Sequence, residues 1–254
     1  MRKSKLLGIL AAVLLALVAM AGPASANHSW GGYHWARTAN PFTLQLGNNT
    51  TGAWSTTYLP VASGDWFQST VLDTTITSGA ANPSCGPVSG RVEVCNGTYG
   101  SNGWLGIATI WISGSHIMQG TVKVNDTYFN TSTYNDPNAK QHVMCQEVGH
   151  TLGLNHQKSK FASSCMNNRF GLFDPAFAHP NQHDYDELVI IYSHTDSFST
   201  VAKAAATAKA GASGDDDSAV PAGAGPQHGN VFARDLGGGR MLVTFVVWAG
   251  HGNN

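Results

Sequence analysis

The sequence contains few charged residues and no excess of either sign. Charged side chains make up 11% of its 254 residues, against about 25% in typical globular proteins, and the formal net charge is -1. A chain without a basic surplus lacks the electrostatic attraction on which nucleic-acid binding depends. We therefore expect no nucleic-acid partner.

Long hydrophobic runs are confined to the start of the chain. The basic residues Arg2, Lys3 and Lys5 precede an apolar run over residues 6–21, and small residues follow up to Ala26. This order is typical of a secretory signal peptide. A membrane span needs about 20 apolar residues, more than this run supplies. We expect cleavage after Ala26, a secreted protein and no membrane contact after cleavage.

The sequence has only four cysteines and no C-x-x-C pair, which argues against a cysteine-rich metal site. An even number of cysteines in a secreted chain indicates two disulfides, and four cysteines allow three pairings. We favour Cys85 with Cys95 and Cys145 with Cys165, because each pair closes a short loop.

The remaining sequence divides by composition. Residues 27–199 are predicted to form one globular domain, because their length suits a single core. Residues 200–229 are rich in Ala, Gly and Asp and are predicted to be a linker. Residues 230–254 contain two β-like segments around a Gly-rich turn, which predicts a hairpin that docks on the main domain.

Four strands are predicted in the main domain from apolar and polar patterning: residues 42–46, 91–95, 104–112 and 120–125. Residues 54–76 combine helix-like spacing with a proline and receive no assignment.

A helix is predicted over residues 137–152. Asp136 is a favourable N-cap, Pro137 suits the first helical position, and Gly153 can end the helix in a left-handed turn. A second helix is predicted to start near Pro180.

The segment CQEVGHTLGLNHQ, residues 145–157, nearly matches a zinc-protease signature. Glu147, His150, Gly153 and His156 occupy the fixed offsets of H-E-x-x-H-x-x-G-x-x-H, but Gln146 stands where the first histidine is expected. Residues four apart on a helix project from one face, about 6 Å apart. Gln146 and His150 can therefore converge on one Zn²⁺ ion.

A chain reversal at Gly153 would bring His156 back as a third ligand. Three protein ligands and a water are typical of a catalytic zinc rather than a structural one. Glu147, one position along, is placed to act as the general base on that water.

The segment is similar to the metzincin clan of zinc endopeptidases, and within it to matrixin-like secreted bacterial proteins that carry Q-E-x-G-H. Residues 163–167 resemble the clan's methionine turn, with Met166 ten residues after His156. Residues 104–112 resemble its edge strand, 120–129 the next strand and 183–192 its C-terminal helix.

This resemblance covers residues 100–195 and implies an α+β fold, with a twisted mixed sheet, an active-site helix and a C-terminal helix. It also implies that an extended polypeptide substrate pairs with an edge strand at residues 104–112. Cys145 and Cys165 directly precede Gln146 and Met166, so a disulfide between them would tie the helix to the methionine turn. We interpret it as compensation for a weakened zinc site.

The glutamine leaves the ligand set open, since an amide oxygen is a weaker zinc ligand than imidazole. His142 lies eight residues from His150, about 12 Å along a helix, and so cannot share its ion. His179 and His183 follow the methionine turn and are alternatives to Gln146.

The sequence thus predicts a monomeric, secreted zinc metalloendopeptidase, a hydrolase. The alternative is a non-catalytic secreted binding protein that retains the fold. The presence of Glu147 favours the enzyme, because a binding protein has no use for a general base.

Overall fold

The computed structural model describes residues 28–81, 84–159, 162–202 and 218–250. The predicted signal peptide and residues 203–217 of the predicted linker lie outside the described residues. Within them, no helix combines the length and the apolar character needed to cross a bilayer.

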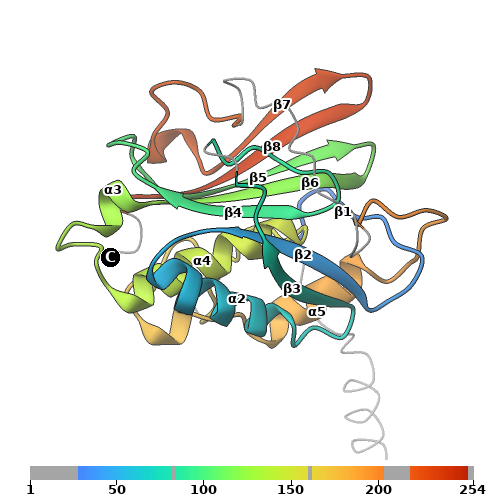
Figure 1. Cartoon of the computed structure of the whole chain (residues 1–254), viewed down its shortest axis with the longest axis horizontal. Helices are drawn as coiled ribbons and strands as arrows, with labels where there is room; N and C mark the ends of the chain where they lie inside the picture. The colour runs from blue at the N-terminus through green and yellow to red at the C-terminus, as the bar shows by residue number, and fades with distance from the viewer. Residues whose placement is uncertain (1–27, 82–83, 160–161, 203–217, 251–254) are drawn as a thin grey trace, which may run out of the picture.

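The described residues form one eight-stranded mixed sheet beside several helices, an α+β architecture (Figure 1). Its strand order is β3-β2-β4-β6-β5-β8-β7, and the short β1 also pairs with β6. The strands are β1 (His34–Trp35), β2 (Phe42–Asn49), β3 (Leu72–Ser78), β4 (Val92–Gly97), β5 (Trp104–Ser113), β6 (His116–Asn125), β7 (Val231–Gly237) and β8 (Arg240–Trp248).

All four strands predicted in the main domain are present, as β2, β4, β5 and β6, and each is longer than predicted. Strands β1, β2, β3, β4 and β6 pair in parallel, whereas β5 runs antiparallel to both β6 and β8. The predicted C-terminal hairpin is also present, as β7 and β8.

The longer helices gather on one side of the sheet (Figure 1). They are α2 (Leu59–Trp66), α4 (Pro137–Thr151) and α5 (Gln182–Ile191), and the shorter turns are η1 (Trp54–Tyr58), α3 (Asp126–Phe129), η2 (Pro175–Phe177) and η3 (Pro226–His228). The unassigned residues 54–76 thus form η1, α2 and the start of a strand, β3, with Pro60 in the first turn of α2.

Helix α4 begins and ends as predicted, within one residue. The Asp136 side chain accepts hydrogen bonds from the backbone amides of Asn138 and Ala139, which caps the helix. Gly153 follows it with a φ of +98°, and a Cβ there would collide with the carbonyl oxygen of Tyr33. Glycine is therefore required at 153 by both conformation and space.

Helix α5 starts at Gln182, two residues after Pro180 and so near the predicted start. Asn181 and Asp184 form a capping box, in which each side chain accepts from the other's backbone amide. The side-chain cap at Asn181 sets the start of the helix.

The expectation that residues 104–112 form an edge strand is wrong. Strand β5 lies between β6 and β8, and it pairs with β8 from Trp104 to Ser113. An exposed β5 edge would leave a row of unpaired backbone groups. The C-terminal hairpin satisfies them and carries the edge outward to β7.

Both favoured disulfides are confirmed: Cys85 pairs with Cys95, and Cys145 with Cys165. The second pair joins α4 to the segment after the motif. Cys145, Cys165 and Met166 are all fully buried in the main core.

Gly149 lets this segment approach α4 closely. A Cβ at 149 would lie 2.5 Å from the Met166 Sδ and 2.6 Å from the Trp66 ring. The fourth residue of Q-E-V-G-H is therefore small for a packing reason.

We expect Gly149→Ala to lower the free energy of unfolding by about 1–3 kcal/mol, because overpacking outweighs the helix propensity of alanine. The matched control is Gly64→Ala in α2, where a Cβ meets no atom within 4 Å. That change should stabilise by about 0.4–1 kcal/mol. Urea unfolding measures both, and equal effects would contradict this account of Gly149.

Candidate functional site

Helix α4 is buried along most of its length, and several of its buried side chains are polar. Gln146, Glu147 and His150 are all 0% exposed. Burying polar groups costs free energy unless they have hydrogen-bond partners or bind an ion. The buried polar side chains of α4 therefore indicate a functional role as well as a packing role.

His150 and His156 face each other through their ring nitrogens. The Nε2 atoms are 3.0 Å apart, and the His150 Nδ1 lies 2.9 Å from the carbonyl oxygen of Leu154. The carbonyl accepts a hydrogen bond from Nδ1, which leaves the lone pair of a neutral His150 on Nε2. This is the orientation in which an imidazole binds a metal ion.

His150 is neutral at ordinary pH. Burial lowers the pKa of His150 to about 3, and the hydrogen bond to Leu154 offsets only part of that effect. A neutral imidazole is the form that binds metals.

A hydrogen bond from its amide group fixes the orientation of the Gln146 side chain. Its Nε2 donates to the carbonyl oxygen of Cys165 over 2.7 Å, next to the disulfide. The Oε1 is buried and has no hydrogen-bond partner among the described residues. The side chain thus directs its nitrogen to the backbone and keeps its oxygen, the atom that can bind a metal, available.

Glu147 lies against strand β5. A Cβ at Gly106 would come within 2.8 Å of its Oε1, so the glycine provides the space for the carboxyl group. Burial raises the pKa of Glu147 well above its usual range, and the backbone amides of Val247 and Ala108 offset only part of this effect. Neither carboxyl oxygen has a hydrogen bond of normal geometry within the described chain.

Met166 packs against α4, where its Sδ lies close to Gly149. Its carbonyl oxygen accepts a hydrogen bond from the Gln157 amide over 2.7 Å, just after His156. The neighbouring Ser164 side chain accepts from the Met166 amide. The turn is therefore held to the segment that carries His156.

The other histidines considered from the sequence take different places. His142 is buried, and burial lowers the pKa of His142 to about 4. His179 pairs with Asp65 over 2.8 Å, and its side chain is 52% exposed. His183 lies in a separate group described next.

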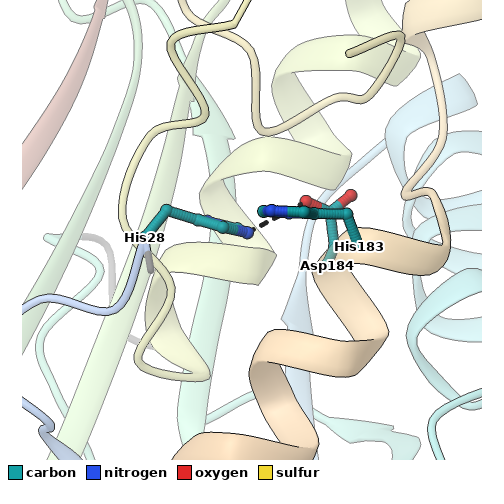
Figure 2. Close-up of side chains that lie close together, drawn as sticks. All are labelled: His28, His183 and Asp184. Atoms are coloured by element: carbon teal, nitrogen blue, oxygen red, sulfur yellow. Dashed lines mark ion pairs between the residues drawn. The ribbon is translucent and has the colours of Figure 1, made fainter. Parts of the chain in front are cut away.

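His28, His183 and Asp184 form a second place where a metal could bind (Figure 2). The His28 Nε2 points at the Asp184 carboxylate, 3.4 Å away, while its Nδ1 contacts the carbonyl oxygen of Asn155. The His183 Nδ1 contacts the side-chain nitrogen of Gln157 at 3.2 Å, and this contact would compete with a metal ion for that nitrogen. The sequence does not reveal this group, because His28 lies far along the chain from the adjacent His183 and Asp184.

A third group, His34, His194 and Asp196, could also bind a metal. Here the Asp196 carboxylate already pairs with the Arg37 guanidinium over 3.0 Å. A cation site with its anionic ligand already paired to an arginine is less suited to a metal ion.

Strand β8 covers the motif. Phe245 is fully buried, and its ring stacks on that of His150 with centroids 4.2 Å apart and planes 8° apart. It also contacts the His156 ring edge-on, at 6.1 Å between centroids. This contact is not predictable from the motif, since Phe245 lies about 90 residues away in the chain.

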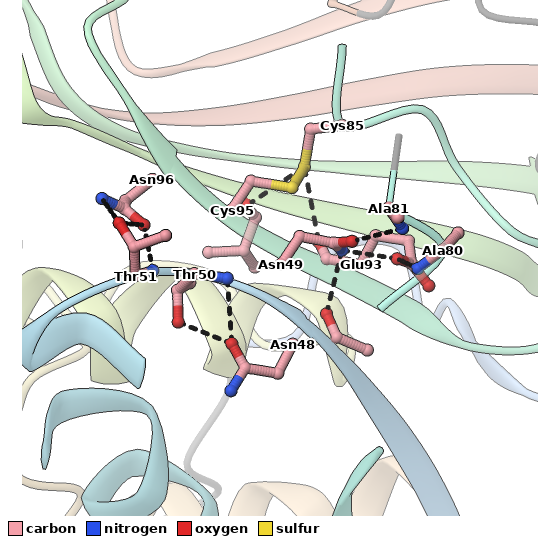
Figure 3. Close-up of a disulfide and its surroundings, with 12 residues drawn as sticks. Asn48, Asn49, Thr50, Thr51, Ala80, Ala81, Cys85, Glu93, Cys95 and Asn96 are labelled. Atoms are coloured by element: carbon pink, nitrogen blue, oxygen red, sulfur yellow. Dashed lines mark hydrogen bonds between the residues drawn. A yellow bond between two sulfur atoms is a disulfide. The ribbon is translucent and has the colours of Figure 1, made fainter. Parts of the chain in front are cut away.

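A polar groove of about 690 Å³ lies elsewhere, at the ends of β2 and β3. Beside it the Cys85–Cys95 disulfide and the buried Glu93 support the strand ends (Figure 3). The Asn49 side chain donates to Glu93 over 2.6 Å, and Arg91 pairs with Glu93. The described lining residues of the groove carry no titratable side chain.

No protein-family model matches this sequence, and no curated protein is significantly similar to it.

Proposed function

We propose that this protein is a secreted zinc-dependent endopeptidase of the metzincin type. The observation that carries the proposal is the facing pair of buried imidazoles, His150 and His156, on either side of the Gly153 turn. Glu147 precedes His150 by less than one turn of the same helix.

The side chains present fit a zinc ion. His150 offers Nε2, and Gln146 offers an unpartnered buried oxygen, so one nitrogen and one oxygen donor come from α4. His156 adds an imidazole from beyond the turn. These three donors leave room for a water, as in catalytic zinc sites.

When bound, zinc would polarise the scissile carbonyl and make the attacking water more acidic. Burial favours the protonated form of Glu147, so the carboxyl group would have to be ionised before it could accept the water's proton and deliver it to the leaving amine. Gln146 remains oriented by Cys165, and Met166 supports the helix from below. No covalent intermediate with the protein is needed.

A second candidate is a secreted binding protein that keeps the fold without catalysis. It is favoured by the burial of the motif beneath β8, because buried side chains cannot meet a substrate. The two candidates differ in whether any form of the protein cleaves a peptide bond.

Zinc content tests the site. We expect His150→Ala to lose one equivalent of zinc relative to wild type, measured by elemental analysis after dialysis, because it removes an imidazole ligand. His183→Ala is the matched control, since it alters the competing group and removes a contact to Gln157 but to none of the proposed zinc ligands. If His183→Ala loses zinc and His150→Ala retains it, the metal binds at His28, His183 and Asp184, and the proposed site is wrong.

Cleavage of casein, stopped by a chelator, tests the chemistry. Glu147→Gln should keep its zinc and lose about 10²–10⁴-fold in rate, the usual contribution of a general base. Gln146→His should bind zinc more tightly, because imidazole is the stronger ligand. The proposal fails if wild type lacks zinc and cleavage while Gln146→His gains both.

The Cys145–Cys165 disulfide should matter for zinc as well as for stability. Replacing both cysteines by alanine should cost about 3 kcal/mol of unfolding free energy, from the entropy of the opened loop. The matched double variant at Cys85 and Cys95 should cost a similar amount. Only the first should weaken zinc binding, because the Cys145–Cys165 disulfide holds in place the Cys165 backbone carbonyl that accepts from Gln146. Equal zinc affinity in both variants would contradict this role.

A further inference from the structure

We propose that the C-terminal hairpin, β7 and β8, is a built-in inhibitory segment that occupies the surface of β5 where an extended polypeptide would pair. The inference rests on the proposed function. It names both the control of the site and the kind of chain that the site accepts.

The hairpin pairs with β5 as a bound peptide strand would. Strand β8 runs antiparallel to β5, with Phe245 opposite Ala108 and Val247 opposite Gly106. Main-chain pairing of this kind is how an extended peptide adds to a sheet edge. Gly106 is also the residue against which Glu147 lies, so β8 crosses the site at the general base.

The hairpin also fills the space in front of the proposed metal ligands. Phe245 stacks on His150 and contacts His156, and all three side chains are at least 97% buried. A scissile carbonyl must approach the same two imidazoles. Substrate and Phe245 therefore cannot be accommodated together.

The position of the hairpin in the fold allows it to leave. Strands β8 and β7 are the last two in the strand order, so their release leaves β3, β2, β4, β6 and β5 contiguous. The outer strand β7 pairs only with β8 among the described strands, and its residues are partly or fully exposed. Residues 200–229, Ala/Gly/Asp-rich in sequence, separate the hairpin from the main domain.

The side chains of β8 indicate which polypeptides fit. Val243, Phe245 and Val247 alternate along the strand and belong to the main core, whereas Val246 and Trp248 pack in a small cluster on the other face. We infer that the preferred substrate is an extended chain with large apolar residues at alternate positions and an aromatic one over His150.

A reversible crosslink tests the proposal in the full chain. Thr109 and Thr244 lie opposite each other on β5 and β8, and their hydroxyl oxygens are 3.0 Å apart. We expect the Thr109→Cys, Thr244→Cys variant, once oxidised, to cleave casein at least tenfold more slowly than its reduced form. Wild type treated with the same reductant is the control.

A substitution at Phe245 tests whether its side chain blocks the proposed site. Phe245→Ala should cleave at least tenfold faster than wild type, while Val246→Ala, a neighbouring core truncation on the opposite face, should not. Equal rates for oxidised and reduced crosslink, together with no gain in Phe245→Ala, would overturn the inference.

Zinc extraction by a chromogenic chelator separates this inference from the proposed function. The oxidised crosslink should release zinc at least tenfold more slowly than the reduced form, because the hairpin covers the site. Equal release rates would overturn the inhibitory role even in a protein that cleaves. Unequal release without cleavage in any variant would instead overturn the proposed endopeptidase activity.

Discussion

The close packing of α4 against the turn at Cys165 and Met166 is the constraint on which the proposed site depends. Gly149 permits the approach, the Cys145–Cys165 disulfide fixes it, and the carbonyl of Cys165 orients Gln146. Without that contact the amide of Gln146 would be free to rotate. Its oxygen would then have no fixed position relative to His150.

The same packing explains why polar side chains can remain buried on α4. Gln146 and His150 each donate one hydrogen bond to a backbone carbonyl. The Gln146 Oε1 has no hydrogen-bond partner among the described residues, and the His150 Nε2 faces the His156 imidazole. Such half-satisfied groups are costly in a folded core. A bound metal ion would relieve that cost, which gives the proposed zinc a role in stability as well as in chemistry.

Much of the local structure was predictable because its signals are local. Asp136 caps the helix through its own neighbours, and Gly153 needs a positive φ whatever surrounds it. The short-loop rule favoured the observed disulfides, although it left three pairings open. The start of α5 near Pro180 was also predictable, and the side-chain cap at Asn181 fixes it at Gln182.

The relative placement of Glu147, His150 and His156 follows from local sequence, since a helix followed by a glycine turn fixes how such offsets project. The cover by Phe245 and the interior position of β5 depend on long-range packing. Strand partners far apart in sequence are chosen by which apolar faces complete the core and which edges need pairing. The motif does not predict this pairing, because the strand that covers it, β8, lies near the other end of the chain.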